Sequence, residues 1–141
     1  MSLTPHGPGF AFLDSFEILE PNKRGRGRKW LNPAAPYFAD HFPGNPIMPG
    51  VLLIECAAQA AGVLWQQTGI VYLAAVSQFR FRKPVLPDQT LEIEVTLEKE
   101  MGTFAQFEAV LRVGPNLGVG AGPTMAAQGK LTLSRVLSTT V

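Results

Sequence analysis

Apolar and polar residues alternate most regularly in the second half of the chain. In TLEIEVTLEKE, residues 90–100, every second position from 91 to 97 is apolar and the positions between them are polar. This period of two predicts a strand with one buried and one solvated face. FAQFEAVLRV (104–113) and the segment around Leu131 and Leu133 follow the pattern less regularly. QFRFRK, residues 78–83, predicts another strand, closed by a proline.

Two further strands are predicted nearer the start of the chain. They are FAFLDSFEILE (10–20) and RGRGRKWL (24–31), joined by a turn at Pro21-Asn22. In the second strand, three arginines fall on one face and two glycines on the other. Just before the helix described next, His41 lies in a segment that is rich in proline and is predicted to be a loop.

One long apolar segment lies between these strands and the later ones. Residues 49–67 predict a helix, because Pro49 suits a first helical turn and Gly69 is placed to end it. The helix has no polar face, so we expect it to be enclosed by the rest of the fold. Two strands, a buried helix and four more strands predict an α+β fold in which a sheet wraps around a central helix.

The composition narrows the function classes. A length of 141 residues predicts one domain, residues 1–141. Charged residues make up only 16%, against roughly 25% in typical soluble domains, which suggests that another subunit covers part of the surface. The net charge of +1 gives no global attraction to nucleic acid or membrane. The apolar stretch 47–65 contains Glu55 and Gln59, which favours a buried soluble helix over membrane insertion.

The sequence also indicates a compartment and the absence of a cofactor. No basic stretch followed by an apolar run opens the chain, and Cys56 is the only cysteine, so a reducing cytoplasmic location is expected. Because no positive group is evident near Cys56 to form a thiolate, we do not expect it to act as a nucleophile. We find no metal-ligand cluster, phosphate loop or dinucleotide fingerprint, so we expect neither a metal nor a cofactor.

Glu55 is unusual because it is a carboxylate on an otherwise apolar helix. Burying an unpaired carboxylate is costly, so such a group is usually held protonated or well hydrogen-bonded, which is what a general acid needs. Gln59, four residues on, shares its helix face and is placed to orient it. The alternative interpretation is that Glu55 points outward at a helix end or belongs to a structural hydrogen-bond network.

His41 begins HFPGNPIMPG, the segment that leads into the helix. Histidine titrates near neutrality and is the commonest general base, although a loop histidine bound to a backbone group is the alternative interpretation. Gly44 permits backbone conformations that other residues avoid, and Gly50 exposes its amide at the helix start, where developing negative charge is favoured. A base, an acid and an amide donor suit proton abstraction next to a carbonyl, with protonation of a leaving hydroxyl.

The segment HFPGNPIMPGVLLIECAAQAAG, residues 41–62, closely resembles the active-site segment of the FabZ-type β-hydroxyacyl-acyl-carrier-protein dehydratases. LTPHGPGFAFLD (3–14) and QFRFRKPVLPDQ (78–89) resemble two further segments of that family. The similarity therefore runs from about Leu3 to Thr96. The resemblance implies the hotdog fold, an antiparallel sheet wrapped around a long central helix, and this agrees with the α+β pattern.

The resemblance also implies residue roles. In that family the histidine of HFPG is the base and a carboxylate fourteen residues later is the acid, which correspond to His41 and Glu55. Gly50 matches the glycine whose amide binds the thioester carbonyl, and Gln59 matches the glutamine four residues after the acid. Both are expected to help bind the substrate. The implied reaction removes water from a (3R)-hydroxyacyl thioester on acyl carrier protein, in fatty-acid or related acyl-chain synthesis, without a cofactor. Glutamate at position 55 resembles the type that does not isomerise the double bond.

By the same resemblance, the active form is a homodimer or a trimer of dimers in which His41 of one chain faces Glu55 of the other. Three alternatives stay open: a specialised polyketide or pigment-pathway dehydratase, a hotdog thioesterase, and a non-catalytic module that binds acyl thioesters. His6, in the family-like opening, is expected to be a structural hydrogen-bonding residue rather than a second base.

Two basic stretches are candidates for a partner surface. KRGRGRK, residues 23–29, places five positive charges in seven residues. It is interpreted either as a solvated strand edge protected by charge or, like the group Arg80, Arg82 and Lys83, as a surface that attracts an acidic carrier protein. Nucleic acid is not expected as a partner of the stretch 23–29, because Trp30 is the only aromatic residue beside its charges.

Overall fold

The structure is a computed structural model that describes residues 3–66, 70–114 and 123–136. Six strands form one antiparallel sheet in the order β1-β2-β4-β5-β6-β3. The strands are β1 (Ser15–Glu20), β2 (Arg24–Trp30), β3 (Val71–Phe81), β4 (Thr90–Met101), β5 (Phe104–Gly114) and β6 (Thr124–Arg135). The helices are the 3-10 turn η1 (Pro8–Phe10), the short α1 (Pro36–Asp40) and the long α2 (Gly50–Trp65). The sequence did not predict η1 or α1.

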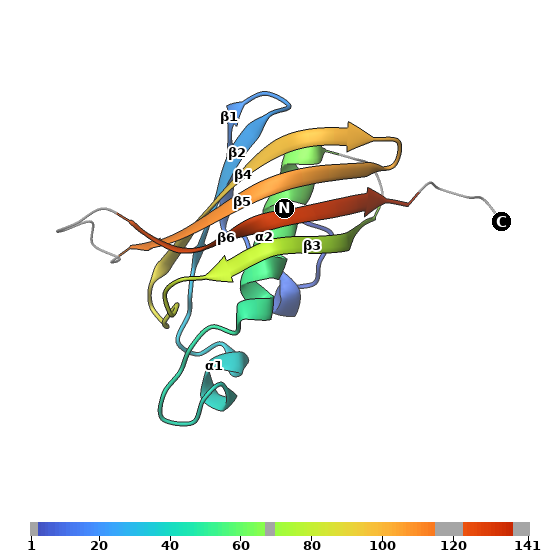
Figure 1. The fold of residues 1–141 in the computed structure, drawn as a ribbon. Coiled ribbons are helices and arrows are strands. Elements are labelled where there is room, and N and C mark those ends of the chain that lie inside the picture. The colour runs from blue at the N-terminus through green and yellow to red at the C-terminus, as the bar shows by residue number, and fades with distance from the viewer. Residues whose placement is uncertain (1–2, 67–69, 115–122, 137–141) are drawn as a thin grey trace.

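The sheet curves around α2, which lies against its concave face (Figure 1). Every second residue of the central strands is buried there: Leu91, Ile93 and Val95 on β4, Phe107, Ala109 and Leu111 on β5, Leu131 and Leu133 on β6. They form one hydrophobic cluster with α2 residues that include Leu53, Cys56, Ala57, Ala60 and Leu64. The α+β prediction and the hotdog fold, a long helix wrapped by an antiparallel sheet, are confirmed. In the described part of the chain, no helix is long and apolar enough to span a membrane.

The N-terminal segment differs from the prediction of a strand over 10–20. The strand begins only at Ser15. The residues before it run beside α2 and include η1, which lies next to the helix (Figure 1). Phe12 and Leu13 are buried in the core, and the Phe12 amide donates to the Gln59 side chain instead of to a neighbouring strand. A hydrogen bond to the helix therefore replaces strand pairing here.

The strand β3 begins earlier than the predicted strand at 78–83. Its pairing with β6 shifts register between Ser77 and Arg80, and Gln78 has a positive φ of 55°. A bulge of this kind breaks the alternation of buried and exposed side chains, which explains why the pattern is legible only from residue 78 onward. β3 is one edge of the sheet, and its large apolar side chains Tyr72, Leu73 and Val76 are 54%, 40% and 40% exposed.

The helix α2 is enclosed only in part, contrary to the prediction from its apolar sequence. The sheet covers one side and the N-terminal segment covers part of the other, but the first turn is open and Val51 is 73% exposed. The described helix ends at Trp65, and Gln66 follows it in a left-handed conformation. The predicted helix-ending residue Gly69 lies outside the described residues. An apolar first turn left in the open has the composition of a surface that a second subunit covers.

Gly129 marks the closest approach between two strands, which gives a stability prediction. A Cβ at Gly129 would lie 2.6 Å from the backbone Cα of Phe79 on β3. We expect Gly129→Ala to lower the free energy of unfolding by about 1–3 kcal/mol, because the β3 backbone must move to accept a methyl group. Gly62→Ala is the control, since a Cβ at this helical position has open space and is expected to stabilise by about 0.5–1 kcal/mol. Urea unfolding of both variants tests this, and a Gly129→Ala variant as stable as the wild-type protein would contradict it.

Candidate active site

Glu55 and Gln59 lie one helical turn apart on α2 and are hydrogen-bonded. The Gln59 Nε2 donates to Glu55 Oε2 at 3.0 Å and to the Phe10 carbonyl at 2.8 Å. The Gln59 Oε1 accepts the Phe12 backbone N–H at 2.8 Å. Gln59 is 3% exposed, and both of its amide hydrogens are used. Gln59 thus orients Glu55, as predicted, and also holds the N-terminal segment on the helix.

A cavity of about 480 Å³ opens beside this pair. Glu55, Gln59 and Gly62 line it from α2, the N-terminal segment contributes His6 and Phe10, and β3 contributes Tyr72. The Glu55 side chain is 22% exposed, so the carboxyl group is neither sealed in the core nor free in solvent. Its Oε2 is held by Gln59, while Oε1 accepts no hydrogen bond from the described residues. A carboxyl fixed through one oxygen leaves the other to give or accept a proton.

His41 follows α1 directly, in a tightly closed loop. Ile47 donates its N–H to the His41 carbonyl at 2.7 Å, and Phe42 and Asn45 exchange two backbone hydrogen bonds of 2.9 Å. Gly44 has a φ of 74°, so the prediction of an unusual backbone conformation there is confirmed. These bonds fix the loop on the approach to α2.

The imidazole of His41 is held in one tautomer. Its Nδ1 lies 3.0 Å from the Ile47 carbonyl oxygen. Because a carbonyl can only accept, Nδ1 must carry the proton in this contact, and Nε2 is left with its lone pair. The ring is half-buried and stacks on Phe42, with 4.1 Å between ring centroids. This is the arrangement that a general base requires.

Gly50 is the first residue of α2 and carries an unused N–H. The helix has no side-chain cap, and its first backbone bonds run from Leu52 and Leu53 to the Pro49 carbonyl. The Gly50 N–H therefore has no acceptor among the described residues, as expected for a first helical position. A Cβ at Gly50 would lie 3.1 Å from the Phe81 ring, so a side chain here would press on Phe81. Helix N-termini favour anionic oxygen atoms.

The structure does not bring all of these groups together within one chain. His41 is not among the residues that line the cavity at Glu55, and in the described part of the chain no contact joins the two side chains. Instead, His6 is the histidine next to Glu55, with its Nε2 3.5 Å from Oε2. No sequence pattern indicates this contact, apart from the position of His6 in the family-like opening.

The other candidate groups are accounted for. Cys56 is fully buried, and burial raises the pKa of its thiol well above the usual range, so it is not a nucleophile. No group of three or more histidine, cysteine, aspartate or glutamate side chains suited to a metal ion occurs among the described residues.

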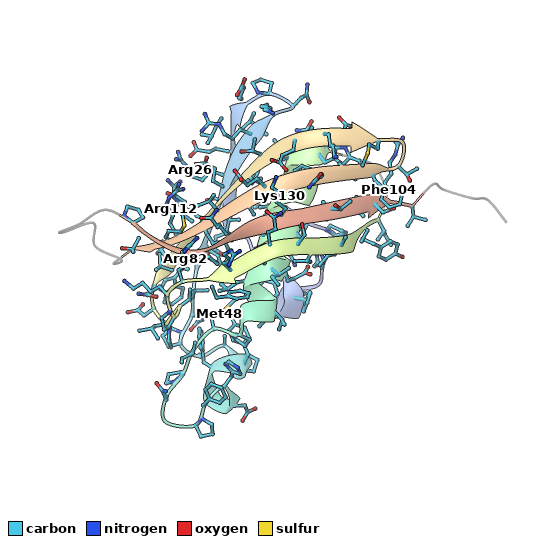
Figure 2. The ribbon with its side chains drawn as sticks, in the orientation of Figure 1. Arg26, Met48, Arg82, Phe104, Arg112 and Lys130 are labelled. Atoms are coloured by element: carbon cyan, nitrogen blue, oxygen red, sulfur yellow. The ribbon has the colours of Figure 1, made fainter. Side chains whose placement is uncertain are left out.

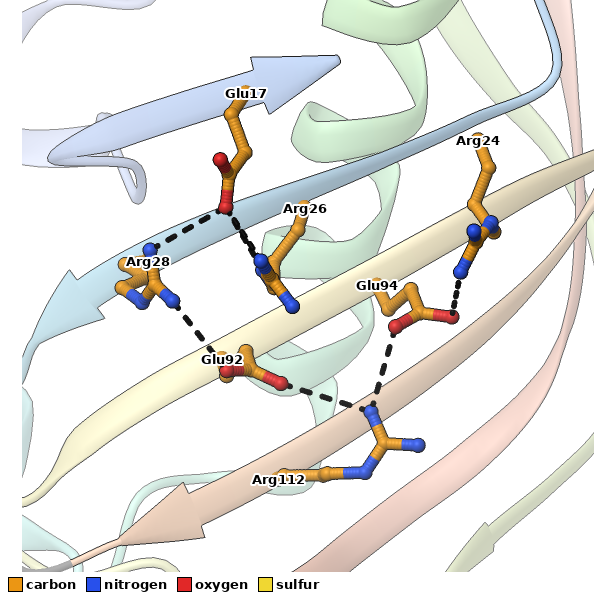
Figure 3. A network of polar contacts seen from close by, with 7 residues as sticks. All are labelled: Glu17, Arg24, Arg26, Arg28, Glu92, Glu94 and Arg112. Carbon is orange, nitrogen blue, oxygen red and sulfur yellow. Dashed lines mark hydrogen bonds and ion pairs between the residues drawn. The ribbon is translucent and has the colours of Figure 1, made fainter. Parts of the chain in front are cut away.

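The basic stretch 23–29 is neither a strand edge nor a free positive surface. β2 lies between β1 and β4, so the interpretation as a protected edge is wrong. Its arginines stand on the outer face of the sheet, where they pair with glutamates of β1 and β4 (Figure 3). The network comprises Glu17, Arg24, Arg26, Arg28, Glu92, Glu94 and Arg112. Within it, the hydrogen bond from Arg26 lowers the pKa of Glu17.

The second basic group, Arg80, Arg82 and Lys83, is exposed and makes no ion pair with any described residue. We call it the basic segment. It lies at the end of β3, where Phe81 contacts the start of α2, and the labelled Arg82 and Met48 lie at the same end of the molecule (Figure 2). The basic segment therefore places unpaired positive charge near the Gly50 end of the candidate site.

Comparison with known proteins identifies similar sequences and folds. The family model of ApeI-like dehydratases (ApeI dehydratase) matches residues 18–114. The 3-hydroxyacyl-[acyl-carrier-protein] dehydratase FabZ of Chloroflexus aggregans is 43% identical over 126 residues, covering 86% of this chain and 88% of the relative. The FabZ of Anaeromyxobacter sp. (strain K) is 40% identical over 119 residues, 79% of this chain and 76% of that one. A chain of the dehydratase heterocomplex ApeI:P from Xenorhabdus doucetiae superposes with a TM-score of 0.64 at 22% identity, covering 88% of this chain and 97% of that chain.

Proposed function

The chain belongs to the FabZ-type family of 3-hydroxyacyl-[acyl-carrier-protein] dehydratases, and from this premise we propose that it removes water from a (3R)-hydroxyacyl thioester carried on acyl carrier protein. The product is the trans-2-enoyl thioester. The observation that supports the assignment most is the Glu55 carboxyl at the cavity, fixed through Oε2 with Oε1 free. A group held in this way is suited to protonate a departing hydroxyl.

The proposed reaction uses three groups. His41 Nε2 takes the proton from the α-carbon, and the C–H electrons form an enolate whose oxygen accepts the Gly50 N–H. The double bond then forms as the β-carbon to oxygen bond breaks, and Glu55 Oε1 gives its proton to the hydroxyl, which leaves as water. The proton taken by His41 returns to Glu55 before the next turnover. Gln59 has no donor left for the substrate, so its role is to orient Glu55.

The proposed site is completed by a second chain. His41 and Glu55 do not meet within one chain, and β3 presents an apolar edge strand next to the cavity, with Tyr72 lining it. Pairing of two β3 edges would cover this surface and remove an unpaired edge, which sheets ordinarily avoid. We propose a homodimer, alone or as part of a trimer of dimers, in which His41 of one chain lies opposite Glu55 of its partner. The low charge content and the open first turn of α2 support the same assembly.

The test of the function is hydration of a crotonyl thioester, the reverse reaction, measured on acyl carrier protein and on coenzyme A. Loss of the enoyl absorbance with formation of the 3-hydroxyacyl product is the expected result. Release of free thiol instead would identify a thioesterase. Tight binding of the thioester by well-folded protein, without turnover on either carrier, would identify a binding module and would overturn the proposal.

The basic segment is proposed to receive the acidic carrier protein, which gives a second prediction. Replacement of Arg80, Arg82 and Lys83 by glutamine is expected to lower kcat/KM for the carrier-bound substrate about tenfold at low salt, because charge complementarity mainly accelerates encounter. The coenzyme A substrate should be affected less than about twofold, since it does not use this protein–protein surface. Stopped-flow or steady-state assays at several salt concentrations measure both.

The matched control removes the same number of charges elsewhere. Replacement of Arg24, Arg26 and Arg28 by glutamine is expected to leave the preference for the carrier-bound substrate unchanged. The charges of these arginines are already paired with glutamates. If this control, and not the basic segment, changed carrier preference, the docking surface would lie on the outer face of the sheet.

A further inference from the structure

We propose that His6 is a positioning residue for Glu55: it holds the carboxyl group through Oε2, so that Oε1 is the oxygen presented to the substrate. This inference deepens the proposed function and rests on the proposed role of Glu55. It assigns a task to a histidine that lies far from the HFPG motif in sequence. Three observations on the N-terminal segment carry it.

The first observation is geometric. The His6 Nε2 lies 3.5 Å from Glu55 Oε2, and the Gln59 Nε2 lies 3.0 Å from the same oxygen. Two nitrogen atoms thus converge on Oε2, and none of the described residues donates to Oε1. An oxygen that already receives donors is the poorer place for the acid proton. The arrangement therefore directs that proton to Oε1.

The second observation fixes the tautomer of His6. Its Nδ1 is buried and has no hydrogen-bond partner among the described residues. A proton on Nδ1 would be a buried donor without an acceptor, which is costly. An unprotonated Nδ1 in the same place lowers the stability of the protein less. The proton of the neutral ring therefore belongs on Nε2, the nitrogen that faces Glu55. This tautomer turns the N–H of the neutral ring toward Oε2, at the observed N···O distance of 3.5 Å.

The third observation is that the segment carrying His6 is fastened to the helix. Gln59 binds the Phe10 carbonyl and the Phe12 amide, each at 2.8 Å. The Phe10 ring packs against the imidazole, with 5.9 Å between ring centroids. Because one glutamine anchors both this segment and Glu55, the positions of the two side chains are set together. Both line the same cavity, as a residue acting on the proposed acid must.

The experiment compares three substitutions of His6. His6→Gln places an amide nitrogen where Nε2 stands, whereas the shorter His6→Asn places it where Nδ1 stands, and His6→Ala removes both. We expect the alanine and asparagine variants to lose about tenfold in kcat with KM changed by less than about twofold, as for one lost hydrogen bond to the reacting group. His6→Gln is expected to retain at least about half of the wild-type kcat.

If His6 had a purely structural role, the His6→Gln and His6→Asn variants would not differ in kcat in this way. Wild-type kcat in His6→Ala would overturn the inference, and so would a glutamine variant as defective as the alanine variant, since the ring itself would then be needed. Thermal unfolding of each variant verifies that it is folded at the assay temperature.

A second measurement separates this inference from the proposed function, because it needs no turnover. In a double-mutant cycle with urea unfolding, His6→Ala is expected to lower the midpoint more in the presence of Glu55 than in a Glu55→Ala background, where only the packing of the ring on Phe10 is lost. His6→Ala combined with Glu94→Ala, on the outer face of the sheet, is the additive control. Equal shifts in both Glu55 backgrounds would overturn the inference even if the enzyme is an active dehydratase. A coupled pair in a protein inactive on every thioester would instead overturn the proposed function alone.

Discussion

Glu55→Gln is expected to lower kcat for hydration of a crotonyl thioester by about 10³-fold, within the range of 10²–10⁴ that a positioned acid or base contributes. The amide cannot supply a proton to the leaving hydroxyl or recover one from water. Its oxygen can still accept the hydrogen bond that Gln59 donates to Oε2 in the native protein. The loss should therefore appear in kcat with KM nearly unchanged. Steady-state kinetics on the coenzyme A substrate measure this without involving the carrier surface.

The control for this variant is stability. Because glutamine matches glutamate in shape and keeps one acceptor, we expect the free energy of unfolding to change by less than about 1 kcal/mol. A folded variant with more than about one tenth of the wild-type kcat would show that Glu55 is not the acid. The interpretation of Glu55 as part of a structural network would then be preferred.

The sequence predicted the parts of the site that depend on local spacing. The contact between Glu55 and Gln59 follows from their separation by four residues on a helix, and it is present at 3.0 Å. The position of Gly50 at the start of the helix and the left-handed conformation of Gly44 could also be predicted. Proline restricts its own backbone to conformations that suit a first helical turn, and glycine permits a positive φ. The alternation in β4 and β5 correctly identified which side chains face α2.

The predictions that were wrong or missing concern contacts between segments that are distant in the sequence. Nothing near His6 indicates that residues 3–14 cross α2 and bring this histidine to Glu55, since that path is set by the Gln59 hydrogen bonds. The arginines of β2 resembled a free basic patch because their glutamate partners, on β1 and β4, are adjacent only after the sheet has formed. The bulge near Gln78 similarly hid the first half of β3.

These errors share a consequence for the mechanism. Charge that is dense in sequence is neutralised in the fold, and the basic segment that stays unpaired lies beside the start of α2. The proposed oxyanion donor Gly50 and the proposed carrier surface are thus at the same end of the molecule.

His41→Ala is expected to be as severe as Glu55→Gln, with kcat lowered by about 10³-fold, because the variant lacks the proposed base. Mixing the two inactive variants tests whether the site is shared between two chains. If each site takes His41 from one chain and Glu55 from the other, a mixed dimer contains one intact site and one doubly defective site. After subunits exchange at equal concentrations, half of the dimers are mixed, so activity should recover to about one quarter of the wild-type value.

Recovery of this size cannot arise when both residues act within one chain, because every chain in the mixture then lacks either its base or its acid. The expected result is therefore a rise of more than 100-fold above the separate variants, detected by the crotonyl assay after unfolding and refolding the two proteins together. Separately refolded variants, combined afterwards at a temperature that prevents exchange, supply the baseline. No recovery in a mixture shown by native mass spectrometry to contain mixed dimers would exclude the shared site. His6, the histidine already beside Glu55 in the same chain, would then become the residue to test as the base.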